Sequence, residues 1–176
     1  MNERASARNG PEAGFSADPA AGPLPARVVP AGVDRSGEHH GFGVSTVDFK
    51  VIAPDGGLLV LENTFHARGG PPRHLHLAQD EWFYALEGEF VIEVGDQRHT
   101  LRPGDSVLGP RRVPRVWAHV GDGRGRILVA FTPAGRMEAF FREVTKADAI
   151  RRRIRRSGGS TAWSRSGRRW RWSSRC

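Results

Sequence analysis

The chain has 176 residues, a formal net charge of +8 and one cysteine, Cys176, so it has the length of one domain with tails and cannot form an internal disulfide. No segment approaches the roughly 18 consecutive apolar residues of a membrane helix, and the first residues do not resemble a secretory signal. These features exclude a helical membrane protein and a disulfide-stapled scaffold, and we expect a soluble protein of a reducing cytoplasm.

The positive charge belongs to one end of the chain. Residues 151–176 hold ten arginines and no acid, so residues 1–150 carry a net charge of −2. Three tryptophans accompany these arginines, and cations beside stacking surfaces are the ingredients for nucleic-acid association. The out-of-frame end of a GC-rich gene would have the same composition, so the sequence leaves both interpretations open.

Three segments differ in composition. Residues 1–40 are rich in Ala, Gly, Pro and Ser and are expected to be disordered, because they bury too little surface to offset their ordering entropy. Residues 41–147 are expected to form the folded domain. Residues 148–176 form a basic tail, predicted to be helical at its start and then disordered.

Short apolar or alternating runs, separated by Gly, Pro and Asp, predict an all-β domain. Glu87-Gly88 and Gly95-Asp96-Gln97 are expected to be hairpin turns. Many short strands at close spacing favour a jelly roll or a small barrel. The expected strands are 44–53, 57–65, 82–86, 89–94, 98–101, 106–108, 113–120 and 126–132.

The period changes after Pro133. Met137, Phe140, Phe141 and Val144 recur at helical spacing with charged residues between them. This pattern predicts an amphipathic helix packed on the outside of the strands, which continues towards residue 154.

The segment from Gly69 to Gly88 carries the clearest chemistry. His74 and His76 are two residues apart, so on a strand both side chains leave the same face. Glu81 follows after a short polar break, where the chain can turn back beside them. Two imidazoles and one carboxylate suit a divalent transition metal such as Fe, Mn, Ni, Cu or Zn.

This spacing resembles the first motif of the cupin superfamily. That motif has a His-x-His pair, then three or four residues, Glu, six residues and Gly, and His74, His76, Glu81 and Gly88 fit it. The motif's leading glycine corresponds to Gly69, which lies one residue too near. The resemblance covers roughly residues 44–145 and implies a cupin-type jelly-roll β-barrel.

The second cupin motif is only half kept. Gly104 and Pro110 match it, but Arg112 stands at a glycine position, Arg115 at the fourth metal ligand and His119 at an asparagine. Arginine has no lone pair for a metal. Either Arg115 turns aside and leaves a three-residue metal site, or a bidentate Arg115–Glu81 pair replaces the metal. His119 lies roughly 13 Å along the strand from Arg115 and is a poor substitute ligand.

The resemblance is closest to small bacterial cupins of the quercetin-dioxygenase-like group. It implies a mononuclear metal held by His74, His76 and Glu81, with Glu81 also available as a base, acting on a small organic substrate. The alternative is a non-catalytic binding or sensor cupin in which Arg115 replaces the fourth ligand. Trp117 and Tyr84 are expected to line the pocket. The resemblance also implies a homodimer.

Four further histidines fit no motif and are expected at the surface or in loops: His39, His40, His66 and His99.

Overall fold

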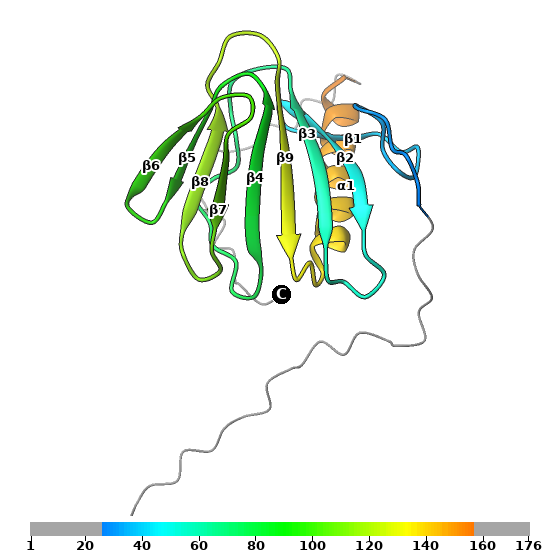
Figure 1. Ribbon diagram of the computed structural model, residues 1–176. Helices are drawn as coiled ribbons and strands as arrows, with labels where there is room; N and C mark the ends of the chain where they lie inside the picture. Colours follow the sequence, from blue (N-terminus) through cyan, green and yellow to red (C-terminus); the bar gives the residue numbers. More distant parts are fainter. Residues whose placement is uncertain (1–25, 157–176) are drawn as a thin grey trace, which may run out of the picture.

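The computed structural model of the protein describes residues 26–156, and they form two antiparallel β-sheets and one helix (Figure 1). The elements in chain order are β1 (His40–Phe42), β2 (Ser45–Ile52), β3 (Leu59–Phe65), β4 (Asp80–Glu87), β5 (Phe90–Val94), β6 (Gln97–Leu101), β7 (Ser106–Gly109), β8 (Arg115–His119), β9 (Gly125–Thr132) and α1 (Met137–Arg156).

The order of the strands is that of a jelly roll. The larger sheet runs β1-β2-β3-β9-β4-β7 and the smaller runs β6-β5-β8. Strand β9 follows the strands of the smaller sheet in the chain and lies between β3 and β4. The chain therefore returns to the middle of the larger sheet. All eight predicted strands are present within a few residues of their expected limits, and the all-β prediction is confirmed.

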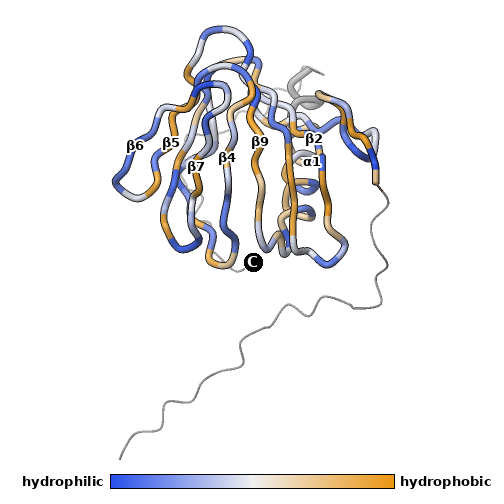
Figure 2. Tube along the Cα trace, in the orientation of Figure 1, coloured by the Kyte–Doolittle hydropathy of each residue, from blue (hydrophilic) through white to orange (hydrophobic). Residues whose placement is uncertain are grey.

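The core lies between the two sheets because apolar side chains alternate along the strands. On β9, Ile127, Val129 and Phe131 are almost completely buried, while the residues between them are partly exposed. Phe83 on β4 and Ile92 on β5 fill the same interior from the two sheets. In Figure 2, hydrophobic residues lie along β9, whereas β6 and much of the connecting loops are hydrophilic.

Helix α1 lies against the β1–β2–β3 half of the larger sheet (Figure 1). The rings of Phe141 and Phe131 lie 5.8 Å apart, and the guanidinium of Arg142 lies 4.8 Å above the ring of Phe49. The predicted helix and its apolar face are therefore confirmed. Helix α1, the one helix in residues 26–156, does not combine the length and the apolar character needed to cross a membrane.

The segment before β1 is fixed to the edge of β2. The buried carboxylate of Asp34 accepts a hydrogen bond of 2.7 Å from the backbone N–H of Phe49, and the N–H of Arg35 donates to the carbonyl of Phe49. This ordered segment lies within residues 1–40, which are expected to be disordered from their composition. Composition could not reveal the order, because it depends on the contacts of one buried carboxylate, that of Asp34. Residues 1–25 and 157–176, including most of the basic tail, lie outside the described residues.

Candidate metal centre

Strand β4 places Glu81 inside the fold. Glu81 alternates with Trp82 and shares the inward face with Phe83 and Ala85, so its side chain is only 3% exposed. Its backbone neighbours are Gly109 on β7 and Phe131 on β9. A carboxylate at this depth needs charged or hydrogen-bonding partners, because burial penalises an isolated charge.

The His-x-His segment lies across the end of β8. The backbone N–H and carbonyl of His74 exchange hydrogen bonds of 2.9 and 2.7 Å with Arg115, and the N–H of Arg112 donates to the carbonyl of His76 at 2.7 Å. This segment lies outside the predicted strands, and its pairing with β8 at His74 is an isolated bridge. The extended backbone nevertheless directs both imidazoles to Glu81.

Gly70 makes this close approach possible. A Cβ atom at Gly70 would overlap the backbone carbonyl of Trp117, so any other residue would push the segment away from β8. Strand β8, which belongs to the second motif, thus holds the His-x-His segment of the first motif in place through backbone contacts.

Both imidazoles point to one carboxylate oxygen. The Nε2 atom of His76 lies 3.5 Å from Oε2 of Glu81, and that of His74 lies 3.7 Å from the same atom. The three potential ligand atoms all lie within 4.8 Å of one another. This is the spacing at which one metal ion can be bound by all three, which fits a two-histidine, one-carboxylate centre.

The ring of His74 is oriented by a neighbouring carbonyl. Its Nδ1 atom lies 2.8 Å from the carbonyl oxygen of Pro72. Because a carbonyl only accepts, the neutral ring donates from Nδ1 and keeps its lone pair on Nε2, which faces Glu81. Metal-bound histidines are commonly oriented by such a contact.

Arg115 lies beside these residues and is completely buried. Its Nη1 donates to the carbonyl of Gly109 at 2.5 Å, its Nη2 donates to the carbonyl of Pro110 at 3.2 Å, and Nη1 lies 3.4 Å from Oε2 of Glu81. Neither of the two alternatives for Arg115 forms as stated: the side chain stays beside Glu81, but a single long contact and no bidentate pair joins the two charges. The arginine is held mainly by two carbonyls.

The electrostatics of the centre favour a charged Glu81. Burial, the largest influence, works to raise the pKa of Glu81, but its contacts with His74 and His76 outweigh burial and lower the pKa below its usual range. Burial likewise works to lower the pKa of His74, whereas Glu81 raises it to a net value above the ordinary one. Oε2 of Glu81 therefore carries negative charge and is surrounded by the basic side chains of His74, His76 and Arg115.

Trp117 and Tyr84, the two residues expected to line the pocket, lie in different environments. Trp117 faces the interior at 6% exposure and contacts the rings of Phe65 and Phe83. Tyr84 lies on the other face of β4 and stacks on Trp82 at 5.6 Å. Placing Tyr84 in the pocket is wrong, because it lies three residues from Glu81 and side chains alternate along a strand.

His119 lies deep in the fold, away from the triad. It is 1% exposed, its ring lies 5.2 Å from that of Phe90, and its Nδ1 contacts the carbonyl of Ala67. It is absent from the group of possible metal ligands. The expectation that it would not act as the fourth ligand agrees with this position.

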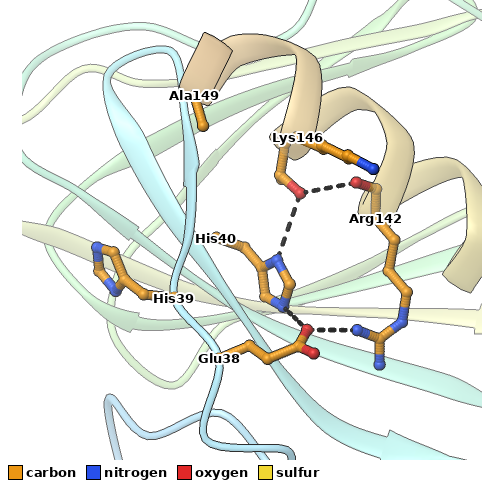
Figure 3. A pocket seen from close by; sticks show the side chains of 7 residues that line it. Glu38, His39, His40, Arg142, Lys146 and Ala149 are labelled. Atoms are coloured by element: carbon orange, nitrogen blue, oxygen red, sulfur yellow. Dashed lines mark hydrogen bonds and ion pairs between the residues drawn. The ribbon is translucent and has the colours of Figure 1, made fainter. Parts of the chain in front are cut away.

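The surface position expected for His40 is wrong. His40 is 9% exposed, and its Nε2 lies 3.1 Å from Glu38 while its Nδ1 lies 3.3 Å from the hydroxyl of Thr145. Figure 3 shows these residues in a pocket between the N-terminal segment and α1, where Glu38 also contacts Arg142. No sequence motif marks this pocket, because its lining comes from residues about 100 positions apart.

Comparison with known proteins agrees with the fold. Residues 62–131 match the family model for the cupin domain, a span that includes His74, His76 and Glu81. The structure is similar to that of KdgF from Halomonas sp., with a TM-score of 0.52, 17% sequence identity, and coverage of 57% of this chain and 90% of that one.

Two more relatives were found. An RmlC-like cupin from Shewanella frigidimarina has a TM-score of 0.48 and 24% identity, covering 56% of this chain and 85% of that one. A protein of Arthrobotrys oligospora named as an oxidoreductase is 32% identical over 60 residues, which cover 33% of this chain and 24% of that relative. The match therefore spans about a quarter of that relative's length.

A jelly roll of this strand order, with a His-x-His segment and a glutamate gathered inside it, defines a small β-barrel with a potential metal centre. Residues 62–131 of this chain form a segment that matches the cupin domain, and the fold around it is a cupin-type jelly roll.

Proposed function

We propose that this protein is a metal-dependent oxidoreductase of the dioxygenase type that acts on a small organic substrate. The observation that supports the proposal is the convergence of His74 and His76 on one oxygen of the buried Glu81. A two-histidine, one-carboxylate centre leaves coordination positions open for a substrate or for dioxygen. The relative named as an oxidoreductase is consistent with this class of activity.

His74, His76 and Glu81 would hold one divalent ion, with Fe, Mn, Ni, Cu and Zn as the candidates. When bound, such an ion supplies Lewis-acid and redox chemistry. The protein's own contribution is orientation and proton transfer. Pro72 fixes the His74 ring, and the three-residue set leaves Glu81 free to exchange as a base when its contact with the ion is loose.

Arg115 favours a second candidate function, which is ligand binding without catalysis. It places a permanent charge 3.4 Å from Oε2 of Glu81, where a metal would also be attracted. At an effective dielectric constant of about 20, two unit charges roughly 4 Å apart interact by about 4 kcal/mol, so this arginine weakens metal affinity substantially. A barrel with weak metal affinity would serve as a sensor or a carrier.

Metal content of the purified full chain tests the proposal. The chain is dialysed against each of the five metals, washed, and measured by elemental analysis beside three variants. We expect about one ion per parent chain, loss in His76→Ala, no loss in the exposed-residue control His66→Ala, and tighter binding in Arg115→His.

Metal bound only by Arg115→His would contradict the proposal and favour the binding function. Oxygen consumption by the loaded parent with a panel of small enolisable compounds then tests catalysis. The homodimer implied by the resemblance stays a prediction that analytical ultracentrifugation checks.

A further inference from the structure

The inward face of β8 is unusually polar. Arg115, Trp117 and His119 alternate with partly exposed residues, and their exposed fractions are 0%, 6% and 1%. Core strands normally present apolar side chains, and a buried polar group normally has a hydrogen-bond partner. Three polar side chains in succession on one interior face therefore call for a physical explanation.

Two of them present donors with no partner among the described residues. These are Nε of Arg115 and Nε1 of Trp117, and both atoms are buried. Each can only donate, because neither nitrogen has a lone pair available to accept a hydrogen bond. A buried donor without an acceptor destabilises the folded state, so these two groups favour a ligand that supplies acceptor oxygens.

His119 belongs to a different environment. Its Nε2 also lacks a partner in the described structure, but the ring fills a space bounded by Gly88, Gly121 and Gly125. A Cβ atom at Gly88 would lie 3.0 Å from this nitrogen. The ring therefore fills its own space, and Nε of Arg115 and Nε1 of Trp117 are the two buried nitrogens on this face that can only donate and have no partner in the described structure.

The position of Arg115 is built for a guanidinium. A Cβ atom at Gly109 would lie 2.7 Å from Nη1 of Arg115, so the glycine provides the space while its carbonyl accepts a hydrogen bond from the same nitrogen. Asp80, the next acidic residue along β4, is already paired with Arg111. Glu81 is therefore the acid that faces Arg115, and any metal on Glu81 leaves the centre with excess positive charge.

We propose that the site takes a small anion with acceptor oxygens, a carboxylate or enolate, and that Arg115 is its specificity-determining residue. Arg115 supplies the charge and one donor, and Trp117 supplies a second donor two residues, or roughly 7 Å, along the strand. The proposal refines the proposed function and rests on it for the reacting centre, since an anion would offset the charge that Arg115 adds to a bound metal.

Binding of small carboxylates to the full chain tests this idea without any activity measurement. The ¹⁵N-labelled chain, both loaded with Zn²⁺ and stripped of metal by a chelator, is titrated with acetate and benzoate and with their uncharged counterparts acetamide and benzamide. The indole N–H resonance of Trp117, assigned with Trp117→Phe, reports contact inside the barrel. We expect a carboxylate to bind at least tenfold more tightly than its amide and to shift this resonance.

Variants identify the source of the preference. Arg115→Met should reduce carboxylate affinity at least tenfold, Arg115→Lys should retain part of it, and the exposed-residue control Arg98→Met should leave it unchanged. Should Arg115→Met fail to fold, the comparison of acid and amide in the parent still decides. Equal binding of acid and amide, or an unmoved Trp117 resonance, overturns the proposal.

The metal content of the same samples separates the two proposals. Stoichiometric metal without carboxylate preference would overturn the anion proposal and leave the metal centre standing. Carboxylate preference in a chain that binds no metal would leave the anion proposal standing and overturn the metal centre.

Discussion

Arg115 and Glu81 face each other across the interior, with Nη1 of the arginine 3.4 Å from Oε2 of the glutamate and both side chains removed from solvent. Removing one member of a buried charge pair leaves the other uncompensated, at a cost of about 3–5 kcal/mol. We expect Arg115→Met to lower the free energy of unfolding by about 3 kcal/mol, measured by urea denaturation.

The same variant should respond more strongly to metal. Once Arg115 is gone, a divalent ion becomes the partner that neutralises Glu81, and a ligand that binds only the folded state raises its stability. Adding Mn²⁺ should therefore raise the Tm of Arg115→Met more than that of the parent. Equal increases in the two proteins would show that Arg115 does not compete with the ion.

Arg112 should be a point of backbone strain. It has a φ of 65° in the β7–β8 loop, a conformation that suits glycine and costs other residues about 1–2 kcal/mol. We expect Arg112→Gly to stabilise the protein by about 1 kcal/mol. The control Arg98→Gly, within β6, should destabilise it by about 0.5–1 kcal/mol. Chemical denaturation measures both, and the same sign for the two variants would refute the explanation.

Gly70 should be intolerant of a side chain. A Cβ atom there would overlap the carbonyl of Trp117, so Gly70→Ala should displace the segment that carries His74 and His76. We expect a loss of about 3 kcal/mol, at the upper end for overpacking, together with weaker metal binding. Gly57→Ala is the control, since its new Cβ would meet only the carboxylate of Asp55. Calorimetric titration measures the metal affinity of both variants. Equal affinities would contradict the role of Gly70 in positioning His74 and His76.

Asp80 should contribute to resistance against acid. Its hydrogen bonds to Arg111 lower its pKa from 3.8 to about 2, so the stability it adds is present above about pH 4 and is lost as the pH falls towards 2. Asp80→Asn should therefore be less stable than the parent at neutral pH, with the difference shrinking below pH 4. Asp96→Asn, in an exposed turn, is the control, and urea denaturation across this pH range is the measurement.

The basic end of the chain should bind nucleic acid through charge. Removing residues 151–176 takes away the ten arginines and three tryptophans of this segment, together with the last six residues of α1. Fluorescence anisotropy with a labelled single-stranded oligonucleotide should show binding by the full chain that weakens steeply with added salt, and little binding by the shortened chain. Equal affinity of the two chains would contradict a role for this segment.

Much of the fold was readable from local patterns. Alternation along residues 126–132 marked β9, and helical spacing of Met137, Phe140 and Phe141 marked α1, because both patterns depend only on which face of an element is buried. The spacing of His74, His76 and Glu81 predicted their grouping. The outward position of Tyr84 was also implicit in its distance of three residues from Glu81.

Only the tertiary structure decided what surrounds these residues. The carbonyls of Gly109 and Pro110 hold Arg115 beside Glu81, and His40 is buried by Thr145, 105 residues away in the chain. Local periodicity determines whether a side chain points inward. The partner it meets there depends on how distant strands and loops pack, and hydrogen bonds between those segments leave no regular pattern in the sequence.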